Sequence, residues 1–282
     1  MISKLLFRLP LMIVACLPAI AQSGSPQPAQ TYLGFDRNDY PGDATLTSLH
    51  QTFVYSGYWL NNPPGSNANT WVGKRSLIEN AGFGFLVLFN GRLYADLKSV
   101  ARATALGKSD GQEAINAAHH EGFSSGTIIF LDQEQGGRML SEQKAYIYSW
   151  VDTVNSSGFG AGIYCSGIPA RESAKVSVVT AEDIRQNASR RSISFFVTND
   201  SCPPSPGCVF PKNPPKPNAS GIDFADIWQF AQSPKRKDFA AGCPANYNRD
   251  GNCYSPGVNP SLHLHVDVET ATSPDPSHGR SR

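Results

Sequence analysis

Short apolar runs that alternate with helical patterns constrain the fold of this chain more than any other feature. Runs such as 83–90, 127–131 and 160–165 are rich in aromatic and β-branched residues and lack polar alternation. Such runs are typical of strands buried on both faces of a parallel sheet. Between them lie helical patterns, the clearest at 141–157, where Ile147, Val151 and Val154 share one stripe. Strands that alternate with helices predict an α/β fold.

Eight strands are expected, at 31–36, 52–59, 83–90, 127–134, 160–165, 194–198, 226–230 and 263–269. Their number and span fit a (β/α)8 TIM-like barrel, partly degenerate in its second half, where loops replace helices. A doubly wound sheet is the alternative, but no Gly-x-Gly-x-x-Gly follows a strand. Further helices are predicted at 43–51, 73–82, 109–122 (opened by a capping box of Ser109 and Gln112) and after a cap at Thr180.

The two ends of the sequence suggest processing and disorder. Residues 1–21 have a basic start, an apolar core and a small-residue cleavage site, which predicts a signal peptide. A linker at 22–30, a barrel domain at 31–270 and a disordered tail at 271–282 would follow. The apolar run is too short to span a bilayer, so we expect a secreted or periplasmic (cell-envelope) protein with no membrane span. Lipoprotein anchoring at Cys16 is the alternative.

Cysteine usage and charge limit the possible partners. An oxidising compartment favours disulfides, and local pairing would join Cys202 to Cys208 and Cys243 to Cys253, although spacing alone does not fix the connectivity. Cys165 remains as a buried free thiol. No His or Cys pairs have zinc-site spacing, so neither a metal nor a cofactor is predicted. The formal net charge of +1 gives no basic excess for nucleic acid.

Acidic residues stand where several predicted strands end. Asp132 and Glu134 are two residues apart, so on a strand both point to one side, with Cα atoms roughly 6.6 Å apart. Carboxyl groups this close hinder each other's ionisation, which raises one pKa. In a barrel, the strand ends would bring Asp36 and Asp267 to the same mouth, beside Trp228 and Gln229. Paired carboxyls with aromatic platforms are what glycoside hydrolysis requires.

Five short motifs carry a family resemblance. They are Gly34-Phe35-Asp36, Leu131-Asp132-Gln133-Glu134, Gly162 to Ser166, Ile227 to Phe230 and Val266-Asp267-Val268, in that order. They resemble the motifs of lysozyme-type glycoside hydrolases of family 25. The opening, 34–41, and the overall layout are closer still to domain-of-unknown-function family 1906 (DUF1906), a glycoside hydrolase-like group. The long cysteine-containing loops depart from the pattern.

The resemblance implies a barrel that acts on peptidoglycan or a related polysaccharide. Glu134 would be the general acid. Asp132 would orient or stabilise the substrate's N-acetyl group or the developing positive charge, while Asp36 and Asp267 would complete an acidic floor. Substrate-binding candidates are Trp228, Gln229, Tyr58 and Tyr164. Two alternatives remain: a catalytically silent carbohydrate-binding barrel, and a barrel whose long loops bind a protein partner.

Overall fold

The computed structural model describes residues 30–200, 213–231, 264 and 266–281. The predicted signal peptide, nearly all of the linker and the cysteines at 202, 208, 243 and 253 lie outside these ranges. Cys165 is described, and it is a buried free cysteine, as expected.

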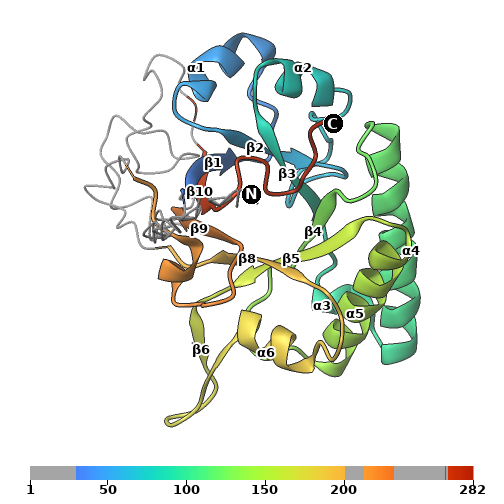
Figure 1. Ribbon diagram of the computed structural model, residues 1–282. Coiled ribbons are helices and arrows are strands. Elements are labelled where there is room, and N and C mark those ends of the chain that lie inside the picture. The colour runs from blue at the N-terminus through green and yellow to red at the C-terminus, as the bar shows by residue number, and fades with distance from the viewer. Residues whose placement is uncertain (1–29, 201–212, 232–263, 265, 282) are drawn as a thin grey trace, which may run out of the picture.

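Eight strands close into a barrel in the order β1-β10-β9-β8-β5-β4-β3-β2 (Figure 1). The bounds are β1 Tyr32–Asp36, β2 Tyr55–Trp59, β3 Gly84–Asn90, β4 Ile128–Asp132, β5 Gly160–Ser166, β8 Ser194–Thr198, β9 Ile227–Ala231 and β10 Asp267–Ala271. Each corresponds to one of the predicted strands. The expected α/β fold with a TIM-like closed barrel is therefore confirmed, and its strands are almost wholly buried.

The last strand differs from the expected pattern. The pairs from β1 through β5, β8 and β9 are parallel, but β10 pairs antiparallel with both β9 and β1. An apolar run does not encode its direction, and an antiparallel strand needs no crossover helix. Asp267 consequently begins its strand instead of ending it. Since it lies in register with Asp36, it still reaches the end of the barrel where the parallel strands finish.

Helices surround the barrel, and the longest two pack together on one side (Figure 1). They are α4 Val100–His120 and α5 Ser141–Ser156. The others are η1 Asp43–Thr45, α1 Leu46–His50, α2 Arg75–Asn80, α3 Tyr94–Leu97, α6 Thr180–Asn187 and η2 Pro217–Ser220. A short hairpin of β6 Pro169–Arg171 and β7 Ser177–Val179 projects after β5. Between β8 and β9 the described residues contain only η2, in line with a degenerate second half.

Two helix starts differ from the sequence prediction. Helix α4 begins at Val100, where the Ser99 side chain accepts from the Arg102 amide, so Ser109 lies inside the helix and caps nothing. Gly107 lies inside α4 for a packing reason: a Cβ there would lie 2.3 Å from the Tyr146 carbonyl oxygen of α5, so glycine allows the two helices to pack closely. Helix α6 begins at Thr180 with Val179 as its N-cap and no side-chain cap.

The segment after β10 is ordered, which corrects the expectation of a disordered tail. It crosses the end of the barrel opposite Asp36, running toward β3 and α2 (dark red in Figure 1). Ser277 is fully buried between β3 and β4: its amide donates to the Phe85 carbonyl, and its own carbonyl accepts from Ile128. The Asp275 carboxylate accepts the Phe85 amide at 2.8 Å. The tail therefore closes the amino-terminal end of the barrel.

None of the helices within the described residues combines the length and the apolar character needed to cross a membrane.

Candidate active site

The carboxyl ends of β1, β4 and β5 bring the predicted acidic residues together. Asp36 ends β1, Asp132 ends β4, and Tyr164 of β5 is the register partner of Asp132. Asp36 and Asp132 are 7% and 4% exposed, whereas Glu134, two residues beyond the strand, is exposed. The electrostatic influence of Glu134 reaches both buried carboxyls. These residues therefore form one acidic site, with Glu134 as its solvent-facing member.

A chain of buried hydrogen bonds crosses the barrel interior beneath this site. The Tyr164 hydroxyl donates to Gln229 Oε1 at 2.8 Å, and Gln229 Nε2 donates to Asp36 Oδ2 at 3.0 Å. The amide of Gln229 is thereby fixed in orientation, because its oxygen accepts and its nitrogen donates. Tyr164 and Gln229, two substrate-binding candidates from the sequence, thus lie in the site, where hydrogen bonds join them to each other and to Asp36.

Burial controls the protonation of the acidic residues. It raises the pKa of Asp132 well above its ordinary value, and the charges of Glu134 and Asp36 raise that pKa further. Burial likewise raises the pKa of Asp36, although the hydrogen bond from Gln229 opposes this shift. Oδ1 of Asp132 has no hydrogen-bond partner within the described part of the chain. The site thus places a buried carboxyl that favours its protonated form beside the exposed Glu134 side chain, so a proton can pass between the two.

A further carboxyl, Glu269, was not selected from the sequence as a site residue. It lies in β10 in register with Gly34 and Gln229, is fully buried, and its pKa is raised well above the ordinary value by burial and by the charge of Asp36. Asp267 and Glu269 have the same two-residue spacing as Asp132 and Glu134. That repeated spacing was the signal that could have identified it.

Two predicted aromatic platforms lie elsewhere. Tyr58 is fully buried outside the barrel wall, where its ring meets Trp71, Phe85 and Phe123 and its hydroxyl donates to Glu121. Trp228 is on the opposite face of β9 from Gln229. Its indole nitrogen donates to the Asn199 carbonyl at 2.9 Å, and its side chain is buried. In this conformation neither ring is available to stack on a sugar at the acidic site.

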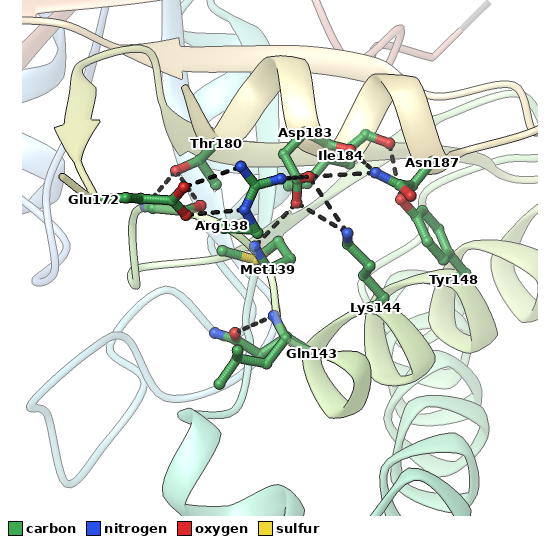
Figure 2. Close-up of polar contacts among 12 residues, drawn as sticks. Arg138, Met139, Gln143, Lys144, Tyr148, Glu172, Thr180, Asp183, Ile184 and Asn187 are labelled. Atoms are coloured by element: carbon green, nitrogen blue, oxygen red, sulfur yellow. Dashed lines mark hydrogen bonds and ion pairs between the residues drawn. The ribbon is translucent and has the colours of Figure 1, made fainter. Parts of the chain in front are cut away.

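The loop that carries Glu134 is fastened to α6 and the hairpin (Figure 2). The Thr180 hydroxyl accepts the Gly137 amide at 2.7 Å and donates to the Gly137 carbonyl at 3.1 Å. The Met139 amide donates to Asp183 at 2.9 Å, and Arg138 pairs with Glu172 through two hydrogen bonds. The segment between β4 and α5 is therefore held at three successive positions, which restricts where Glu134 can lie.

A pocket of about 680 Å³ opens beside Asp132 and Glu134. Its other walls come from the loop after β2, the segment from the end of β3 through α3, and helix α4. They include Asn61, Asn69, Asn90, Arg92, Asp96, Asp110 and Glu113. The volume is within the range of small-molecule sites. Within the described ranges, no group of three or more His, Cys, Asp or Glu is arranged to hold a metal ion.

Together, a closed α/β barrel and carboxyls gathered at the ends of its parallel strands define a TIM-like barrel with an acidic site at its mouth. The family can also be stated. The sequence matches the family described as "Rv2525c-like, glycoside hydrolase-like domain" over residues 56–196, half of the chain, and it belongs to that family. This is the DUF1906 group that the motifs indicated. No curated protein matches the sequence significantly.

Solved structures show the same fold. An uncharacterized protein of B. stearothermophilus is 16% identical, with a TM-score of 0.50 over 85% of this chain and 95% of that one. The Tat-secreted protein Rv2525c of Mycobacterium tuberculosis, in complex with L-tartrate, is 14% identical, with a TM-score of 0.50 over 87% of this chain and 97% of that one. The catalytic domain of endolysin ply40 from a Listeria bacteriophage is less similar, with a TM-score of 0.46 and 13% identity over 89% of this chain and 96% of that one.

Proposed function

We propose that this protein hydrolyses glycosidic bonds in peptidoglycan or a related polysaccharide. The observation that carries the proposal is the meeting of Asp36, Asp132 and Glu134 at the open end of the barrel, beside a pocket large enough for sugar residues. Membership of a glycoside hydrolase-like family supports it. The tail at the opposite end leaves the carboxyl end of the strands as the face where substrate would bind.

Glu134 is the residue we expect to protonate the leaving oxygen, because it is exposed and lines the pocket. Asp132 is buried behind it and favours its protonated form, so it acts by hydrogen bonding to the substrate or to Glu134. Asp36 is held by Gln229 and supplies negative potential beneath the developing positive charge of the sugar ring. Asp267, in register with Asp36, would complete the acidic floor.

Turnover of purified cell walls by matched variants tests this proposal. Glu134→Gln removes the exchangeable proton with almost no change in size, and we expect kcat/KM to fall by about 10² to 10⁴, the usual contribution of a general acid. Glu182→Gln changes an exposed glutamate on α6 and serves as the control, with activity unchanged. Equal turnover by Glu134→Gln and the unaltered protein would exclude Glu134 as the acid. Saccharide binding without any turnover would instead indicate a silent carbohydrate-binding barrel.

We also propose that the protein is exported and acts outside the cytoplasm. The signal-like residues 1–21 support this, as does the description of the M. tuberculosis structural neighbour as Tat-secreted. Amino-terminal sequencing of the mature protein distinguishes the two routes. A start at Gln22 indicates a released protein, and a lipid-blocked start at Cys16 indicates an anchored one.

A further inference from the structure

The pocket beside Glu134 has an unbalanced charge. Asp96, Glu113 and Glu134 line it and are exposed, and no cation lies within 4 Å of any of them among the residues that the structure describes. Several carboxylates in one cleft raise the local concentration of cations, because the low-dielectric walls focus their field. An anionic ligand would be repelled from this pocket.

Among the described residues of the wall, the one arginine, Arg92, does not offset this charge, since it is already paired. Arg92 Nε and Nη2 donate to the two oxygens of Asp110 at 2.6 and 2.7 Å. The Tyr146 hydroxyl donates to the same carboxylate at 2.9 Å. Asp110 is only 3% exposed, so this bidentate pair is a fixed part of the pocket wall. The charges of Arg92 and Asp110 cancel, and three exposed carboxylates remain.

A second observation points to a ligand in the same pocket. Asp132 lines the pocket and is only 4% exposed. The protonated side chain shares a hydrogen bond with Glu134, but its Oδ1 atom has no hydrogen-bond partner within the described residues. Buried polar atoms are nearly always paired, because an unpaired one forfeits its hydration without compensation. A donor supplied by a ligand would satisfy this oxygen, and an ammonium group carries three N–H donors and a positive charge.

We infer that the pocket binds a saccharide that carries a free, protonated amine, such as an oligomer of glucosamine, in preference to its N-acetylated form. This inference rests on the proposed function for the saccharide part and extends it by naming the class of sugar. Acetylation converts the amine to a neutral amide, which removes both the charge and two of the three donors. Asp96 and Glu113, away from the reacting bond, would select the amine.

Calorimetric titration of the full-length protein with three tetramers tests this inference. They are glucosamine tetramer, N-acetylglucosamine tetramer and a neutral glucose tetramer, at a pH that keeps the amine protonated. We expect the glucosamine tetramer to bind roughly tenfold or more tightly than either of the others at low salt, the size of effect that charge focusing in a cleft produces. Its affinity should fall as sodium chloride shortens the screening length, from about 10 Å at 0.1 M.

Matched variants locate the preference. The double variant Asp96→Asn with Glu113→Gln should bring the affinity for the glucosamine tetramer close to that for the acetylated one, with an unchanged circular dichroism spectrum. Glu182→Gln, on the remote helix α6, should keep the full preference. Equal affinities for amine and acetylated tetramers, salt-independent binding, no binding of the glucosamine tetramer, or an unaltered preference in the double variant would each overturn the inference.

Two further comparisons keep this result separate from the proposed function. Trilysine carries amines without sugar, so binding of trilysine as tight as that of the glucosamine tetramer would overturn the assignment to a saccharide. Loss of wall turnover in Glu134→Gln tests hydrolysis, whereas the double variant Asp96→Asn with Glu113→Gln tests the amine preference and leaves Glu134 in place. If the native protein turned over cell walls but bound the amine and acetylated tetramers equally well, this inference would be overturned and the hydrolase proposal would stand.

Discussion

Asp183 offers a direct test of how the loop carrying Glu134 is held. Its carboxylate accepts the Met139 amide at 2.9 Å, lies 3.3 Å from Lys144 Nζ and is 4% exposed (Figure 2). Hydrogen bonds to a charged group contribute about 1.5–3 kcal/mol each. Lys144 is 24% exposed, so solvent weakens that second interaction. We expect Asp183→Ala to lower the free energy of unfolding by about 3 kcal/mol.

A neighbouring residue supplies the control. Glu182 is also in the first turn of α6, so it interacts with the helix dipole as Asp183 does, but it is exposed. Glu182→Ala should change the free energy of unfolding by no more than about 0.5 kcal/mol. Asp183→Asn retains an acceptor for the Met139 amide and should lie between the two. Urea denaturation of all three measures the effect.

The same variants should also affect the site. Loosening the loop displaces Glu134, and small misplacements of a catalytic group are costly, so kcat/KM of Asp183→Ala should fall by about tenfold or more. If Asp183→Ala and Glu182→Ala were equally stable and equally active, the view that Asp183 positions this loop would be refuted.

Three other changes test the interior and the tail. In Gly57→Ala the new Cβ would lie 2.6 Å from the Cβ of Asp36, so calorimetry should show a loss of about 1–3 kcal/mol in the free energy of unfolding. Gly136→Ala, with no neighbour closer than 3.4 Å, should be nearly neutral. Similar losses in the two variants would contradict the steric argument. Burial raises the pKa of Glu269 well above 4.5, so the folded chain keeps a proton that the unfolded chain releases. The free energy of unfolding therefore falls as pH rises past about 4.5. Glu269→Gln should flatten this fall in urea titrations at several pH values, and an unchanged pH dependence would contradict the role given to Glu269. Asp275→Ala removes the acceptor of the Phe85 and Gly279 amides, so the free energy of unfolding measured by thermal denaturation should fall by about 3 kcal/mol. An unaltered Tm would mean that the tail does not stabilise the barrel.

The barrel could be predicted from sequence because buried parallel strands leave a strong local signal. The run Phe-Gly-Phe-Leu-Val-Leu-Phe at 83–89 is typical of a strand buried on both faces, and β3 covers Gly84–Asn90. Asp36 and Asp132 followed from the same signal, because the polar residue that ends such a run marks the mouth of a barrel. That the two residues lie close together follows from the barrel fold, because the carboxyl ends of its parallel strands lie at one end.

Long-range pairing explains what the sequence did not predict. The direction of β10 depends on its partners β1 and β9, and nothing within 267–271 encodes it. Gly107, which suggests a helix end when seen alone, is required by the close approach of α5. Ser277 appears in a Ser/Pro-rich stretch typical of disorder, and only the backbone groups of Phe85 and Ile128 give it a fixed place. Trp228 has the aromatic side chain of a sugar platform, but it points to the opposite face of β9 from Gln229 and so away from the acidic site.

The closing strand has a consequence for biosynthesis. Because β1 pairs with β10, the first and last strands of the barrel must meet, and Asp36 and Asp267, which are far apart in the sequence, lie in register where they do. A growing chain therefore carries open sheet edges on β1 and β9 until β10 leaves the ribosome. We expect the yield of native protein to depend on how well those edges are shielded during synthesis.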